Sequence, residues 1–310
     1  MKLAFYSLTG WSIGKIEREV SAYFPEDWRV KWFDFRECHD PELFHELLDE
    51  DYHFVSPGYA ATVLMKDYSI PAERIFYIVY DENEFERTIQ TLRMEGLDIH
   101  TMFDAFYGYG VFSDLLRNIS IARGVHRIPS VLGLGLNVND YTYRSRETLE
   151  VLGYAQKWER KDTPQGLDIK RGPLAQAVAD RVGLELRRTN LEIVGESGGP
   201  ELNDWYQSVD LILVPSLIEG GPLAPFEAAA CGIPTIGTPV GTFMWFCAMG
   251  GGIVVDPRPS FFIEDATAVV NHLKENPAHY QELCEAAYDK VKWYDWSYQH
   301  DGWLEFFTRD

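Results

Sequence analysis

The chain contains 310 residues, of which 46% are apolar and 25% are charged, and its formal net charge is −20. At roughly 100–200 residues per domain, this length favours two domains over one. A surface this acidic repels phosphate backbones, which argues against nucleic acid and anionic lipid as main partners. The apolar runs are shorter than the roughly 18–20 residues of a membrane span, and the four cysteines lack metal-binding spacing. We therefore expect a cytoplasmic protein without a signal peptide or an integral membrane segment.

The first half alternates strand-length apolar segments with helical patterns. Residues 15–24 and 42–48 each repeat apolar side chains at the spacing of one helix face. The strands expected in this half span residues 3–7, 30–35, 52–56, 75–80, 103–107 and 127–132. Strands that alternate with helices predict a mostly parallel sheet covered on both faces.

The second half repeats this pattern. Its expected strands span residues 151–154, 191–194, 211–214, 235–236 and 253–255, and its expected helices span residues 174–182, 202–208, 223–231, 263–276 and 278–292. We predict two doubly wound, Rossmann-like α/β domains facing across a cleft, one over residues 1–143 and the other over residues 144–292. In such sheets, ligands bind beyond the carboxyl ends of the strands, where helix N-termini point.

One segment of the second half indicates a binding site. A buried strand is followed by a loop that carries Glu219, Gly220 and Gly221, and then by a helix that contains Glu227. The glycines let backbone amides approach a ligand, and a helix start favours phosphate by roughly 0.3–1 kcal/mol. A carboxylate beside a phosphate is unfavourable unless it binds hydroxyls, which contribute about 1.5–3 kcal/mol each. These features predict a ligand with phosphates and vicinal hydroxyls, which means a nucleotide or a sugar nucleotide.

About twenty residues from Pro215 to Pro234 resemble the Glu-x7-Glu signature of glycosyltransferase family four, with Glu219 and Glu227 as the two glutamates. The stretch before this strand and the loop after the next strand also resemble the family. Its members are retaining, metal-independent transferases with the GT-B fold. The resemblance therefore implies no cofactor, with a nucleotide sugar as co-substrate.

The resemblance also implies roles for individual residues. Glu227 would bind the ribose hydroxyls of the donor nucleotide, and Glu219 would contact a hydroxyl of the donor sugar. Backbone amides at the helix start would hold the sugar and the diphosphate. The donor-binding residues implied in this way are Glu227, Gly220, Gly221, Pro222, Leu223, Ala224, Gly195, Glu196, Gly10 and Gly14.

A diphosphate leaving group needs cationic or helix-end stabilisation. The family supplies an Arg and a Lys after the first strand of its second domain. In this chain Lys157 corresponds to the Arg and Arg171 to the Lys, so the residue types are exchanged. Lys161 and Lys170 are alternatives for the same role.

In the first domain, many family members carry a His near the reacting sugar, but this chain has Tyr80 and Asp81 at that place. Tyr80 or Asp81 would orient the donor sugar or the acceptor. The aromatic-rich segment of residues 293–310 is expected to form a helix that packs back on the N-terminal domain, as is common in GT-B proteins.

The resemblance therefore implies a hexosyltransferase-like enzyme that moves a sugar from a UDP- or GDP-linked donor to an acceptor hydroxyl with retention of configuration. The acceptor would be a glycan, a lipid-linked glycan or a small molecule. Two alternatives remain: a non-catalytic nucleotide-sugar-binding protein, and another GT-B enzyme such as a sugar-nucleotide epimerase. An NAD-dependent enzyme is disfavoured, because Val138 stands where the dinucleotide fingerprint begun by Gly133 and Gly135 requires its third glycine.

Overall fold

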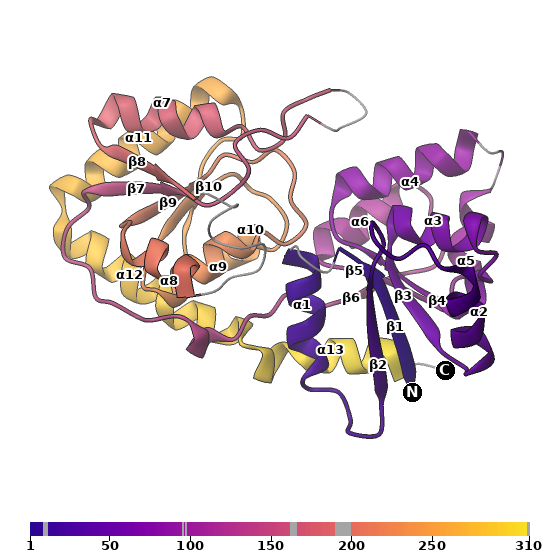
Figure 1. Cartoon of the computed structure of the whole chain (residues 1–310). Coiled ribbons are helices and arrows are strands. Elements are labelled where there is room, and N and C mark those ends of the chain that lie inside the picture. The colour runs from indigo at the N-terminus through magenta and orange to yellow at the C-terminus, as the bar shows by residue number, and fades with distance from the viewer. Residues whose placement is uncertain (9–11, 95, 97, 162–165, 190–199, 309–310) are drawn as a thin grey trace. The chain divides into compact units, whose positions relative to one another are not determined.

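The computed structural model describes the chain except for residues 9–11, 95, 97, 162–165, 190–199 and 309–310 (Figure 1). The chain divides into two compact units, one formed by Met1–Gly135 with Trp296–Asp310 and the other by Leu136–Asp295. Each unit is built on one sheet, and all strand pairs in both sheets are parallel within the described residues. The predicted fold class of two doubly wound α/β domains is confirmed.

The first unit contains a six-stranded sheet in the order β2-β1-β3-β4-β5-β6. Its strands are β1 (Lys2–Ser7), β2 (Arg29–Asp34), β3 (His53–Pro57), β4 (Ile75–Val79), β5 (Gly108–Val111) and β6 (Ser130–Val131). The strand order reverses at β1, so right-handed crossovers place the helix after β1 on one face and the later helices on the other. These helices are α1 (Ser12–Ser21), α2 (Pro41–Asp49), α3 (Gly58–Asp67), α4 (Glu82–Met94), α5 (Ile99–Ala105) and α6 (Asp114–Ala122), with a 3-10 turn η1 (Ala72–Arg74) before β4.

The last helix of the chain, α13 (Trp296–Thr308), belongs to the first unit. It contacts α1, β5 and β6. Trp303 and Phe307 are fully buried, and the ring of Phe307 meets that of Phe5 edge-on at 6.2 Å. The helix begins at residue 296 rather than 293, because residues 292–294 form the 3-10 turn η3 (Lys292–Tyr294) in the second unit.

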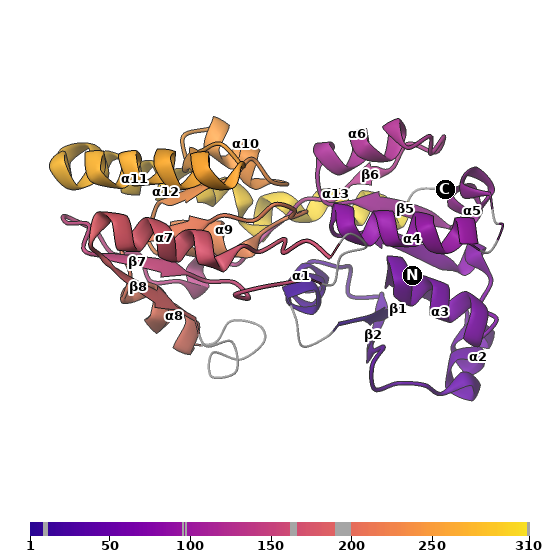
Figure 2. The ribbon, with the colours of Figure 1, turned by 90° about the horizontal axis from the view of Figure 1, so that it is seen from above.

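The second unit contains a five-stranded sheet in the order β11-β10-β9-β7-β8. Its strands are β7 (Val151–Tyr154), β8 (Glu185–Arg188), β9 (Leu211–Val214), β10 (Thr235–Gly237) and β11 (Ile253–Val254). Helices α7 and α11 pack together on one face, whereas α8, α9 and α12 lie on the other (Figures 1 and 2). The helical elements are the 3-10 turn η2 (Val138–Asp140), α7 (Gly172–Val182), α8 (Pro200–Gln207), α9 (Leu223–Ala230), α10 (Phe243–Ala248), α11 (Pro259–Glu275) and α12 (Pro277–Val291).

The prediction of a strand at residues 103–107 is wrong, because the structure has no strand there. Most of this segment belongs to helix α5, whose N-terminus is capped by Asp98 through a 2.9 Å bond from the Thr101 amide. The strand follows as β5, which contains Gly108 and Gly110. A Cβ atom on Gly108 would lie 2.4 Å from the ring of Phe76, so the packing requires glycine there. Glycines weaken the sequence pattern of a strand, which explains the error.

The units divide before Leu136, not after residue 143. The amide of Leu136 donates to the carbonyl of Tyr294 at 3.0 Å, within the second unit. The side chain of Arg146 is almost fully buried and donates to the carboxylate of Asp210 at 3.0 Å. These bonds fix the polar segment between the halves to the second unit. Nowhere in the described part of the chain does a helix combine the length and the apolarity that crossing a bilayer requires.

Candidate functional site

The loop between β9 and α9 lies where the strand order of the second sheet reverses. β9 pairs with β7 on one side and β10 on the other, while the chain arrives from β8 beyond β7. In open parallel sheets, ligands bind beyond the carboxyl ends of the strands at such a reversal. The fold therefore brings the segment singled out from the sequence to the edge where a ligand is expected.

Bonds from neighbouring segments fix the conformation of this loop. The amide of Leu217 donates to the carbonyl of Ile169 at 2.8 Å, and the amide of Thr242 donates to that of Gly220 at 3.1 Å. Gly241 has a φ of +46°, and a Cβ atom there would lie 2.0 Å from the Gly220 oxygen. Only glycine permits the main chain at residue 241 to approach that of Gly220 so closely.

Three donors converge on one oxygen of Glu219. Its Oε1 accepts from Nε2 of Gln156 at 2.9 Å, from Oγ of Ser216 at 2.8 Å and from Nζ of Lys170. The side chains of Glu219 and Lys170 are 12% and 13% exposed, so this ion pair is largely shielded from water. Gln156 follows β7, and Ser216 follows β9. The two strand ends therefore contribute jointly to holding one carboxylate.

Of the four candidate cations, the structure brings Lys170 to Glu219. The guanidinium of Arg171 instead donates to the main-chain oxygens of Pro215 and Pro257, at 2.6 Å in each case. Burial lowers the pKa of Arg171. This side chain ties the end of β9 to a neighbouring loop.

The other two cations lie in different surroundings. Lys161 is exposed and pairs with Glu159 at 2.7 Å. The carbonyl of Lys157 accepts a 2.7 Å hydrogen bond from the hydroxyl of Tyr154. Within the described residues, neither Lys161 nor Lys157 forms an ion pair with Glu219.

Glu227 lies in α9 and is only 6% exposed. Its Oε1 accepts from the hydroxyl of Tyr141 and its Oε2 from that of Tyr206, both at 2.9 Å. Burial, and after it the charge of Glu227, raises the pKa of Tyr206 well above its ordinary value, so this tyrosine stays a donor.

Helix α9 begins without a side-chain cap. Its N-cap residue is Pro222, whose side chain accepts no hydrogen bond from the helix. Because first-turn amides have no carbonyl partner within a helix, those of Leu223 and Ala224 are suited to an external acceptor. Leu223 and Ala224 are 9% and 6% exposed. Gly220, Gly221 and Pro222 connect this helix start to Glu219, as the sequence pattern predicts.

The first-unit candidates occupy two different environments. The hydroxyl of Tyr80 donates to Oε1 of the buried Glu17 at 2.6 Å. Asp81 accepts the amide of Glu84 at 2.8 Å, which caps the start of α4. Gly14 is buried in the first turn of α1. The predicted donor-binding residues Gly10, Gly195 and Glu196, and the strand predicted at residues 191–194, lie outside the described residues.

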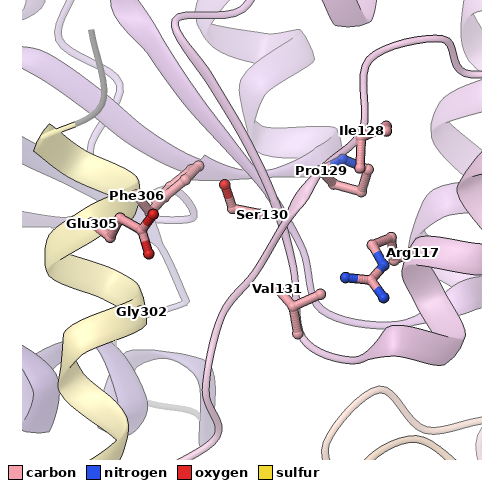
Figure 3. A pocket seen from close by; sticks show the side chains of 8 residues that line it. All are labelled: Arg117, Ile128, Pro129, Ser130, Val131, Gly302, Glu305 and Phe306. Carbon is pink, nitrogen blue, oxygen red and sulfur yellow. The ribbon is translucent and has the colours of Figure 1, made fainter.

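A separate pocket of about 300 Å³ lies in the first unit (Figure 3). Its lining includes Arg117 of α6, Pro129 and Ser130 at the edge strand β6, and Glu305 and Phe306 of α13. No residue assigned from the sequence lines it.

Sequence reasoning missed Gln156 as a partner of Glu219 and Glu17 as a partner of Tyr80. Both contacts join residues 63 positions apart; Gln156 lies in the segment in which Lys157 was singled out, and Glu17 lies in none of the motifs. For Gln156, the expected doubly wound sheet was a signal, because loops that follow the strands meet at one edge of such a sheet.

Residues 176–290 match the sequence family described as glycosyl transferases group 1. Over 100 residues, the chain is 33% identical to D-inositol 3-phosphate glycosyltransferase 1 of Catenulispora acidiphila, a stretch that covers 32% of this chain and 23% of that protein. The matches to the first three curated relatives span 23% to 31% of those proteins.

Two solved structures resemble the chain over nearly its whole length. HepE from Anabaena, in complex with UDP and glucose, has a TM-score of 0.70 at 13% identity and covers 100% of both chains. Sucrose-phosphate synthase from Thermosynechococcus elongatus has a TM-score of 0.70 at 14% identity, with 99% of this chain and 98% of that chain covered.

The chain therefore has the GT-B fold. Within that fold, the stretch that matches the group 1 glycosyl transferases, residues 176–290, belongs to the second unit. This matched stretch contains both Glu219 and Glu227, but it ends before the last helix and leaves the first unit unmatched.

Proposed function

We propose that this protein is a glycosyltransferase that transfers a sugar from a UDP- or GDP-linked donor to an acceptor hydroxyl, with retention and without a metal. The single observation that carries the proposal is the pair Glu219 and Glu227. They lie on one loop and helix at the reversal point of the second sheet, with Lys170 against Glu219. The family match over the same residues supports it.

The residues divide the donor between them. Glu227 would accept the ribose hydroxyls, and the first-turn amides of α9 at Leu223 and Ala224 would bind the diphosphate. Glu219 would accept a hydroxyl of the sugar. Lys170 carries three donor protons, so its ammonium group can bind Glu219 and a phosphate oxygen together. This assigns to Lys170 the cationic role for which Arg171 and Lys157 were the first candidates.

In the proposed reaction, the bond between the anomeric carbon and the diphosphate oxygen breaks, and a bond to the acceptor oxygen forms on the same face. The acceptor proton passes to the departing diphosphate oxygen. The protein then contributes orientation and stabilisation of the charge that develops on the leaving group. No side chain has to act as a nucleophile.

The partners follow from this chemistry. The donor is a nucleotide sugar and the acceptor is a hydroxyl compound, and the names of similar proteins support this. One is a D-inositol 3-phosphate glycosyltransferase, and one solved neighbour holds UDP and glucose. We also infer a cytoplasmic location, which agrees with the four free cysteines.

The experiment that tests the function incubates the protein with UDP-, GDP- and ADP-sugars and measures nucleotide release and nucleotide affinity. Glu227→Gln is expected to weaken nucleotide binding by about 10–100-fold, the range of a hydrogen bond to a charged group. Glu219→Gln is expected to keep nucleotide binding and lose turnover. Glu264→Gln, an exposed change on α11, is the control and should behave like wild type.

The outcomes distinguish the proposed transferase from the alternative functions. Binding without turnover would indicate a nucleotide-sugar-binding protein, and conversion of the donor sugar without any acceptor would indicate an epimerase. If Glu219→Gln and Glu227→Gln bind and react like wild type, the site is assigned wrongly. Retention is checked by the NMR coupling of the product's anomeric proton, and metal independence by turnover in EDTA.

A further inference from the structure

The hydrogen bonds to Glu219 are distributed unequally between its two oxygens. All three of its donors meet at Oε1. Within the described part of the chain, no donor reaches Oε2. One oxygen is therefore anchored by the protein, and the other retains its acceptor capacity.

Gln156 holds a central place in this arrangement because its amide both donates and accepts. Nε2 donates to Glu219 at 2.9 Å, and Oε1 lies 2.8 Å from the hydroxyl oxygen of Ser216. The single proton of Ser216 serves either Gln156 or Glu219, so its hydroxyl can bond to either neighbour while Nε2 of Gln156 keeps its own bond to Glu219. A lysine or arginine in place of Gln156 would lack the acceptor, and a glutamate would lack the donor.

The charges of the cluster lead to the same conclusion. Lys170 supplies the one positive charge among the three groups that bind Glu219, while Gln156 and Ser216 are neutral. The neutral amide fixes the direction of the carboxylate without repelling it or adding a second counter-charge. Its contribution is therefore geometric.

We propose that Gln156, with Ser216, is a positioning residue that aims Oε2 of Glu219 at a hydroxyl of the donor sugar. This inference rests on the proposed function. Because the ordering of Glu219 is completed before the ligand arrives, the sugar does not have to fix the carboxylate itself, and the contact is stronger for that reason. The predicted signature is a loss of affinity for the sugar part of the donor alone.

The test compares the dissociation constants of a free nucleotide and of the matching nucleotide sugar, using UDP with UDP-glucose and GDP with GDP-mannose. The dissociation constant of the nucleotide divided by that of the nucleotide sugar measures, in wild type, what the sugar adds to binding. Gln156→Met keeps the side-chain length but removes both hydrogen bonds, and we expect it to reduce this ratio by about 10-fold. The affinity for UDP or GDP alone should stay within about twofold of wild type.

The chain offers a matched control in Gln176. This glutamine is also half-buried and also donates to a carboxylate at 2.9 Å, that of Asp180 in the same helix α7. Gln176→Met should leave the ratio unchanged. Ser216→Ala should reduce the ratio less than Gln156→Met, because Gln156 and Lys170 still bind Glu219, and it decides the matter if Gln156→Met does not fold.

Three results would overturn the inference: unchanged affinities for nucleotide and nucleotide sugar in the variants, an equal loss of both affinities, or a wild-type protein in which the sugar adds nothing. The second of these would assign Gln156 a purely structural role. A wild-type protein that binds neither UDP nor GDP would instead contradict the proposed function, and this inference would fall with it.

Discussion

The hydroxyl of Tyr80 donates a 2.6 Å hydrogen bond to Oε1 of Glu17, and the hydroxyl of Ser7 donates to Oε2 of the same carboxylate. Glu17 is fully buried. Burial raises its pKa to about 7, and this outweighs the opposing effect of the two hydroxyls and of Arg18. Tyr80 stands where many members of the resembling family have a histidine. Its hydroxyl is thus bound to Glu17, a residue that no sequence motif pointed to.

The first prediction concerns stability against pH. Because the pKa of Glu17 rises from 4.5 to about 7 on folding, the folded chain binds this proton more tightly. The resulting stability is fully present below about pH 4.5 and is lost as pH rises through 7, on the order of 3 kcal/mol in total. Glu17→Gln removes this loss, so its Tm relative to wild type should increase from pH 5 to pH 8.

A second variant refines that measurement. Tyr80→Phe removes one donor that favours the ionised form of Glu17, so the loss of stability should move to higher pH. Thermal unfolding of the three proteins across this range is the measurement. A difference between Glu17→Gln and wild type that does not change with pH would contradict the assignment.

The second prediction concerns the cation beside Glu219. Lys170→Met should lower turnover by about 100-fold, because a donor to the leaving diphosphate is lost. Lys161→Met removes only an exposed ion pair with Glu159 and should leave turnover unchanged. Nucleotide release from the donor is the readout for both. Loss of turnover in Lys161→Met but not in Lys170→Met would reverse the assignment.

The third prediction uses two glycines with positive φ. Gly250→Ala places its methyl group in open space and should cost only the left-handed backbone conformation, about 1–2 kcal/mol. Gly241→Ala adds a collision with the main chain of Gly220 and should cost more. Because this collision displaces the loop before α9, Gly241→Ala should also lose nucleotide binding. Equal Tm values for the two variants would show that the loop yields without cost.

The fourth prediction separates capping from chemistry at Asp81. Its bond to the Glu84 amide caps α4, so Asp81→Ala should lose about 1 kcal/mol of unfolding free energy. Asp81→Asn preserves the cap and should retain both stability and turnover. A turnover loss in Asp81→Asn at unchanged Tm would mean that the carboxylate takes part in the reaction.

The sequence predicted buried strands well and polar or glycine-rich ones poorly. The bounds predicted for β7 and β9 are those of the structure, because both consist mainly of apolar residues and occupy the middle of a sheet. β8 was not predicted, since it is an edge strand that carries Glu185 and two arginines. The glycines of β5 hid that strand for a different reason, which is the close packing of Phe76.

At the candidate site, the motif identified Glu219 and Glu227, but only the fold revealed what holds them. Tyr206 lies 21 residues before Glu227, and Tyr141 lies 86 residues before Glu227. No pattern in the sequence connects either tyrosine to this glutamate. Likewise, the sequence put Lys157 and Arg171 ahead of Lys161 and Lys170, and the main-chain carbonyls that engage Arg171 are not encoded by any side chain.

The position of α13 determines the order in which the two units can complete their folding during translation. The first sheet is made early, yet Trp296, Trp303, Phe306 and Phe307, which fill part of its core, are made only after the whole second unit. The second unit is complete once Asp295 has been made, so it can fold while the first still lacks a piece of its interior. A nascent chain stalled before residue 296 should therefore expose the aromatic residues that α13 covers, Phe5 and Phe76 among them, to chaperones.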